Sequence, residues 1–216
     1  MARRAGLPWD VLHRVALYSA FVGLLGAKLF GLFELRHWPG DLTQALQSIG
    51  SAGLVFYGAP LTALPFAAWR LRTQRLPVWL CLDIAAIGFA IGGAIGRIGC
   101  FLGGCCHGTP TSSPFGITPD SAHAPLGMPL HPVQLYESLG MGILFLLLLY
   151  RFSKRAFDGE IVMLFLFGYA TLRFVVEMFR GDADRGYVVA GLSTSQTISI
   201  VLFLAVGLLL AWRRKC

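Results

Sequence analysis

Six apolar runs, each about 20 residues long, follow one another along this 216-residue chain. They cover approximately residues 11–34, 52–70, 77–102, 132–150, 160–180 and 194–212. A helix of about 20 residues crosses the hydrocarbon core of a bilayer, which is about 30 Å thick. A soluble core of this size does not require such runs in series. The sequence therefore predicts an all-α, polytopic transmembrane bundle of about six helices, with residues 1–216 forming a single integral membrane domain.

Positive charge gives this bundle an orientation. Clusters of Lys and Arg lie at both termini and in two connections, at residues 3–4, 70–75, 151–155 and 213–215. Six spans place all four clusters on one side, which the positive-inside rule identifies as cytoplasmic. The net charge of +7 is then mostly topological and predicts no nucleic-acid partner. Residues 103–131 contain no Lys or Arg, and we predict an ordered outer loop there.

Charged residues inside the predicted spans need a separate explanation, because one ion near the bilayer centre costs about 2.5–3.5 kcal/mol to insert. We interpret the set as marking a functional site. For any single member, pairing between helices or snorkelling from a span end is an equal alternative. The six residues are Lys28, Asp83, Arg97, Glu137, Arg173 and Glu177.

Two arginines of this set fall near the predicted outer face. Arg173, Glu177 and Arg180 are spaced i, i+4 and i+7, which places them on one helical face. Arg173 and Glu177 either form a structural salt bridge, or Glu177 orients an arginine that binds phosphate. Arg97 precedes a glycine-rich exit from its span, where backbone can approach an anion. Two arginines at this depth suit a phospholipid headgroup.

The segment HPVQLYE carries a polar face into the fourth span. His131, Gln134 and Glu137 follow one another at i+3 steps, and His131 precedes a proline suited to a first helical turn. A histidine here is either a capping or interfacial residue or a catalytic base.

Three segments together resemble the bacterial prolipoprotein diacylglyceryl transferase family. They are GRIGCFLGGCCHG, HPVQLYE and RFVVEMFR. Weaker matches are SAGLVFYGAPLTA, LGAKLFGLFE and STSQTISI, and all six keep the family's order along nearly the whole chain. The resemblance implies the family's seven-helix pattern without its first span, and both termini in the cytoplasm.

The resemblance also implies an activity. Members of the family transfer the diacylglyceryl group of phosphatidylglycerol to the lipobox cysteine thiol of a prolipoprotein, at the outer face of the inner membrane. They release glycerol phosphate, form a thioether and need no cofactor. The implied catalytic residues are Arg97 and Arg173 for the phosphate, Glu177 to orient Arg173, and Tyr57. The implied substrate-binding residues are Lys28, Gly99, Gly104, Gly108, His131, Gln134, Tyr136 and Glu137.

The chain departs from the family pattern at the base. The family has Phe-His-Gly-Gly where this chain reads Phe56-Tyr57-Gly58-Ala59. A tyrosine with an ordinary pKa near 10 is a poor base at neutral pH. Transfer to another acceptor, or hydrolysis, at the same headgroup site is therefore the alternative hypothesis.

A second departure is the cluster Cys100, Cys105, Cys106 and His107. Cys100 stands where the family has Asn, and Cys105 stands near its Glu. The main expectation is that these small polarizable side chains pack in the loop without a metal. Thiolates and imidazole also suit zinc or copper, and a labile disulfide or an acceptor thiol is possible. A membrane thiol or metal sensor without enzymatic activity is therefore a third hypothesis.

Overall fold

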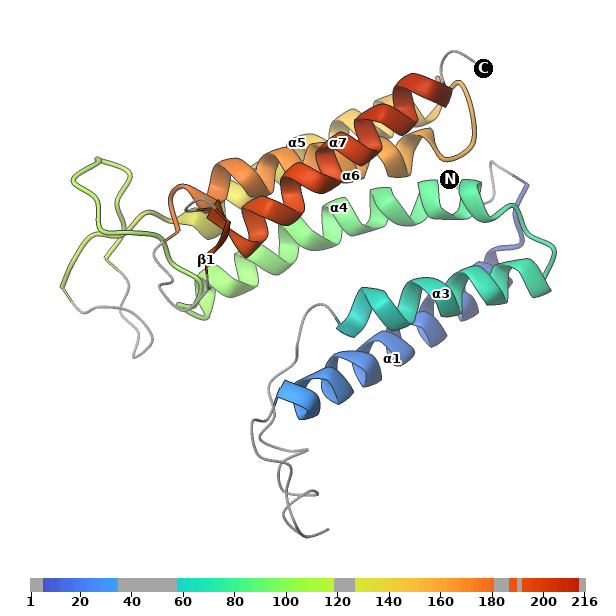
Figure 1. The fold of residues 1–216 in the computed structure, drawn as a ribbon, viewed down its shortest axis with the longest axis horizontal. Helices are drawn as coiled ribbons and strands as arrows, with labels where there is room; N and C mark the ends of the chain where they lie inside the picture. The colour runs from blue at the N-terminus through green and yellow to red at the C-terminus, as the bar shows by residue number, and fades with distance from the viewer. Residues whose placement is uncertain (1–5, 35–57, 119–126, 181–186, 190–191, 214–216) are drawn as a thin grey trace, which may run out of the picture. The chain divides into compact units, whose positions relative to one another are not determined.

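The fold was analysed in a computed structural model, which describes residues 6–34, 58–118, 127–180, 187–189 and 192–213 (Figure 1). Each of the six predicted spans overlaps one described helix, so the expectation of an all-α bundle is confirmed. A short antiparallel pair, β1 (Tyr187–Val189) and β2 (Leu192–Ser193), precedes the last helix. The helices are α1 (Trp9–Glu34), α3 (Gly58–Thr73), α4 (Val78–Leu102), α5 (Val133–Phe152), α6 (Glu160–Glu177) and α7 (Thr194–Arg213).

Three of these helices are long and apolar enough to cross a membrane. They are Trp9–Gly31 of α1, all of α4 and all of α5. Large apolar side chains lie exposed on all three, among them Phe21 on α1, Phe89 on α4 and Leu146 on α5. Exposed apolar surface on this scale is not compatible with water as the surrounding solvent. The chain is a membrane protein.

The chain divides into two units, Met1–Cys81 and Leu82–Cys216. In the first unit, α1 and α3 pack through small residues. A Cβ atom built on Gly58 would lie 2.5 Å from the carbonyl oxygen of Gly26, and one built on Gly26 would meet the hydroxyl of Thr62. The Thr62 hydroxyl donates to the carbonyl of Gly58 at 2.9 Å. Such close approach of two backbones is typical of helix pairs in lipid.

In the second unit, α6 packs between α5 and α7. The loop after α4 and the β1–β2 pair lie at one end of this bundle, and the α5–α6 connection lies at the other (Figure 1). At the connection end the Asp83 carboxylate is fully buried. It accepts hydrogen bonds from the backbone N–H groups of Gly159 and Val162, at 2.8 and 2.9 Å.

These bonds cap the N-terminus of α6, where backbone donors lack helical partners and the helix dipole favours a negative charge. Asp83 lies 14 residues before Arg97 on α4, which is about 21 Å along a helix. For Asp83 the structure shows a contact between helices, which is the structural alternative stated for each embedded charge.

The described parts of the loop over residues 103–131 join three helix ends. The Gly108 N–H donates to the carbonyl of His131 at 2.9 Å, and the Thr109 N–H donates to the carbonyl of Phe179 at 2.9 Å. Ile117 and Leu130 exchange two backbone hydrogen bonds. A Cβ atom on Gly108 would lie 2.5 Å from the Phe179 oxygen, so only glycine fits this crossing. The loop thereby holds the exit of α4, the entry of α5 and the end of α6 together.

Candidate functional site

An ion pair between α4 and α5 forms the first half of the site. Arg97 Nη2 donates to Glu137 Oε1 at 2.8 Å, and the Glu137 side chain is only 3% exposed. One turn away, the Ser138 hydroxyl donates to the Ala94 carbonyl at 2.8 Å. Gly93 lets the side chain of Met141 approach the backbone of α4. These contacts fix the depth at which Arg97 enters the space between the helices.

An ion pair within α6 forms the second half. Arg173 Nη2 and Glu177 Oε2 lie 2.6 Å apart, and the two side chains are 9% and 6% exposed. Arg173 Nη2 also donates to the hydroxyl of Ser195, in the first turn of α7, at 3.3 Å. The i, i+4 spacing thus produces the predicted contact. Arg180 lies outside this helical face, because α6 ends at Glu177 and the following residues form a turn.

The two ion pairs belong to one electrostatic cluster. Both arginines interact electrostatically with Glu137 and with Tyr169. Tyr169 lies one helical turn before Arg173 and was not predicted as a site residue, although its i−4 position shares the face of Arg173 and Glu177. The structure therefore brings together side chains from α4, α5 and α6 that are separated by up to 80 residues in the sequence.

Two buried polar atoms of this cluster make no hydrogen bond within the described part of the chain. Arg173 Nη1 and Glu137 Oε2 are both buried and have no hydrogen-bond partner among the described residues. An unpaired guanidinium donor in a buried position is costly, because its hydration has been lost without replacement. An anion such as phosphate would satisfy it, with the planar fork of the guanidinium matching the phosphate oxygens.

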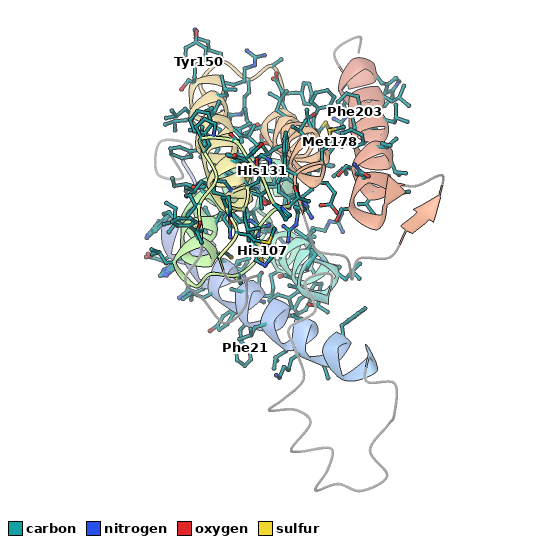
Figure 2. All side chains as sticks on the ribbon, turned by 90° about the vertical axis from the view of Figure 1, so that its left-hand side faces the viewer. Phe21, His107, His131, Tyr150, Met178 and Phe203 are labelled. Atoms are coloured by element: carbon teal, nitrogen blue, oxygen red, sulfur yellow. The ribbon has the colours of Figure 1, made fainter. Side chains whose placement is uncertain are left out.

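Residues at the entry of α5 surround the end of α6. His131 Nδ1 lies 3.2 Å from the Tyr136 hydroxyl, and the rings of both residues contact the Phe179 ring edge-to-face. The N-cap of α5 is Pro132, so His131 does not cap the helix. Gln134 Nε2 donates to the carbonyl of Cys105 at 2.7 Å. Figure 2 views the molecule from this end, with His107 and His131 labelled.

An apolar cavity of about 470 Å³ opens beside these aromatic side chains. It shares two of its walls, Tyr136 and Phe179, with the aromatic contact just described. Its chemistry suits a hydrocarbon chain and not a polar headgroup. The lining residues are Phe115, Tyr136, Leu172, Val175, Val176 and Phe179.

The turn after α4 holds the predicted glycines and cysteines. Gly104 has φ 66°, in the left-handed region that glycine adopts at helix ends. A Cβ atom on Gly99 would meet no described residue within 4 Å. The sulfur atoms of Cys100, Cys105 and Cys106 lie within 4.8 Å of one another. Burial, followed by the neighbouring thiols, raises the pKa of the Cys105 thiol to about 11.

Two predicted site residues, Lys28 and Tyr57, are not among the described residues of this cluster. Lys28 lies half-buried on α1, in the first unit. Tyr57 lies outside the described residues. The roles suggested for both stay predictions.

Comparison with known proteins identifies the family. A family model for prolipoprotein diacylglyceryl transferase matches residues 1–212. The chain belongs to the prolipoprotein diacylglyceryl transferase family. Phosphatidylglycerol–prolipoprotein diacylglyceryl transferase of Clostridium tetani is 34% identical over 200 residues, covering 92% of this chain and 79% of the relative. The protein of the same name from Finegoldia magna is 31% identical over 217 residues, covering 100% and 83%.

A third relative, phosphatidylglycerol–prolipoprotein diacylglyceryl transferase 2 of Clostridium perfringens, is 35% identical over 209 residues. The match covers 93% of this chain and 78% of the relative. Membership of the diacylglyceryl transferase family therefore extends over both units of the chain, including Lys28 and Tyr57.

Proposed function

We propose that this protein transfers the diacylglyceryl group of phosphatidylglycerol to a cysteine thiol of a prolipoprotein. Family membership and the names of the three relatives support the reaction class. The observation that carries the proposal is the buried donor Nη1 of Arg173, which has no described partner and lies in one electrostatic cluster with Arg97. The phosphate of phosphatidylglycerol supplies the charge and the oxygen atoms that this cluster needs.

The chemistry follows from the bond that must break. A thiolate sulfur attacks the glyceryl carbon that bears the phosphate ester, a carbon–sulfur bond forms, and the carbon–oxygen bond breaks. Glycerol phosphate leaves with the electron pair, and the thiol proton passes to a base. Tyr57 remains the predicted residue at the base position. Arg97 and Arg173 stabilise the negative charge that develops on the leaving phosphate.

The carboxylates have a positioning role in this proposal. Glu137 and Glu177 each hold one arginine in a fixed rotamer before the lipid arrives. A guanidinium that is already oriented loses less side-chain entropy on binding the anion. Gln134, His131 and Tyr136 shape the wall between this cluster and the outer loop, while the apolar cavity accepts an acyl chain.

We further propose that the site faces the outside of the bacterial inner membrane, with both termini in the cytoplasm. Arg151 lies in the last turn of α5, and Lys154 and Arg155 follow in the α5–α6 connection. This end of the second unit is opposite the loop over residues 103–131 (Figure 1). The positive-inside rule favours the cytoplasm for that end. The loop end, where Arg97 meets Glu137, then faces outward.

Transfer can be measured with the full-length protein in detergent micelles, supplied with phosphatidylglycerol and a lipobox peptide. Mass spectrometry should detect a thioether-linked diacylglyceryl peptide, together with released glycerol phosphate. Arg173→Lys should reduce the rate about 100-fold or more, because one point charge replaces a planar donor fork at a transition-state contact. Arg97→Lys should have an effect of the same order.

Arg155→Lys is the matched control, since Arg155 pairs with Asp158 at the surface of the other end. It should retain the wild-type rate. Release of glycerol phosphate without a modified peptide would refute the acceptor and favour hydrolysis or another acceptor. Full activity of Arg173→Lys would refute the phosphate-binding role.

A further inference from the structure

The thiols of Cys100, Cys105 and Cys106 form a cluster that the transferase chemistry does not use. Their three sulfur atoms lie within 4.8 Å of one another, at the junction of α4 with the outer loop. All three side chains are half-buried, so the sulfur atoms are shielded in part but remain reachable from outside. The cluster is not produced by a simple helical repeat, because Cys105 and Cys106 follow the end of α4 at Leu102.

The backbone of this turn brings the three sulfur atoms together. The Cys105 N–H donates to the Cys100 carbonyl at 3.2 Å, and the Cys105 thiol donates to the same oxygen at 3.6 Å. Cys106 has φ 63°, a left-handed conformation that is unfavourable for a residue with a side chain. Gln134 holds the turn from α5 through the Cys105 carbonyl at 2.7 Å. Strain maintained by surrounding contacts in this way is typical of functional positions.

The number and type of the donors select the metal. Three sulfur atoms at about 2.3 Å from one ion, a usual metal–thiolate distance, lie about 4 Å apart in a trigonal arrangement. The cluster needs to contract by less than about 1 Å to reach that geometry. A closed structural zinc site has four protein ligands, whereas the described group contains three, and zinc with three protein ligands keeps a water in the fourth position. Soft thiolate ligands favour Cu(I).

We propose that Cys100, Cys105 and Cys106 form a trigonal binding site for Cu(I). Binding replaces three S–H bonds by three S–Cu bonds and releases three protons, and copper keeps its oxidation state. The bound centre carries a net charge of −2, from three thiolates and one monovalent cation. Cys100 lies one helical turn beyond Arg97 and interacts with it electrostatically, so this charge develops beside the arginine cluster.

The test is a titration of the reduced, full-length protein in detergent with Cu(I) under anaerobic conditions, against a chromophoric Cu(I) chelator. We expect one tightly bound Cu(I) per chain, with the ultraviolet absorption of copper–thiolate bonds. Single substitutions Cys100→Ser, Cys105→Ser and Cys106→Ser should each weaken binding about 100-fold or more, since a lost ligand costs at least as much as a lost supporting contact. Cys81→Ser is the matched control, because Cys81 is a buried α4 cysteine outside the cluster.

X-ray absorption of the copper-loaded wild-type protein gives an independent answer if a variant fails to fold. Three sulfur neighbours at a single distance support the site. Two sulfur neighbours, loss of all copper to the chelator, or wild-type Cu(I) affinity in all three variants would overturn it. Binding of one Zn(II) per chain with no retention of Cu(I) would also overturn it, as would wild-type Cu(I) affinity in Cys105→Ser.

Discussion

The cap that Asp83 provides for α6 allows a quantitative test of which embedded charges are structural. Asp83→Ala removes a buried carboxylate that accepts two backbone hydrogen bonds, at 2.8 and 2.9 Å. A hydrogen bond to a charged group contributes about 1.5–3 kcal/mol, so the loss amounts to about 3–6 kcal/mol. The Gly159 and Val162 donors are left without this partner at the start of the helix that carries Arg173.

Thermal unfolding in detergent measures this loss. Since 1 kcal/mol shifts the melting temperature by about 2–4 °C in a chain of this size, a loss of about 3–6 kcal/mol in Asp83→Ala should lower it by about 6–24 °C. Asp83→Asn keeps one acceptor oxygen and should have about half that effect. The matched control is Asp158→Ala, which removes a surface ion pair and should cost less than about 1 kcal/mol.

The same variants separate stability from catalysis. At a temperature where Asp83→Ala is still folded, its transfer rate should stay within about twofold of wild type, because Asp83 lies about 21 Å along α4 from Arg97. Arg173→Lys should show the opposite pattern, with a large loss of rate. Equal melting temperatures for Asp83→Ala and Asp158→Ala would refute the capping argument. A reduced transfer rate in folded Asp83→Ala would show that Asp83 also contributes to the transfer reaction.

Three further predictions concern local geometry. Gly108→Ala places a methyl group 2.5 Å from the Phe179 oxygen and should destabilise the protein by about 1–3 kcal/mol in denaturant titrations; unchanged stability would show that the loop can move away. Gly26→Ala meets the Thr62 hydroxyl and should weaken the α1–α3 pair by a similar amount, measured as faster proteolysis of the first unit; wild-type resistance would contradict this. In the copper-free protein, the rate of Cys105 alkylation should rise about tenfold per pH unit up to about pH 11, because only the thiolate reacts. Tandem mass spectrometry measures this rate at each pH. A rate already maximal at pH 9 would refute the raised pKa of Cys105.

Much of the secondary structure follows from the sequence, because apolar runs of this length have few alternatives in lipid. The prediction for α4 was residues 77–102, and the helix is Val78–Leu102. The end of α6 was predicted at residue 180, but the helix stops at Glu177. Beyond this end, the Phe179 carbonyl accepts the Thr109 N–H of the loop after α4. No pattern within the span could show this contact.

Several features of the candidate site depended on distant contacts. The i, i+4 spacing predicted that Arg173 meets Glu177, because helix geometry fixes neighbours three and four residues apart. The spacing along one helix could not predict that Arg97 pairs with Glu137, 40 residues away, or that Tyr169 interacts with both arginines. Nor could it show that Asp83 caps α6, 76 residues later in the chain.

The sequence by itself determined the all-α bundle, the positions of its helices and the family, because hydrophobic length and local spacing act within single segments. Only the tertiary structure decided what the embedded charges do. A charge in a membrane must find a partner, and which partner it finds depends on how helices from different parts of the chain pack. That packing places the Asp83 carboxylate at the N-terminus of α6 and groups Arg97, Glu137 and Arg173 in one cluster.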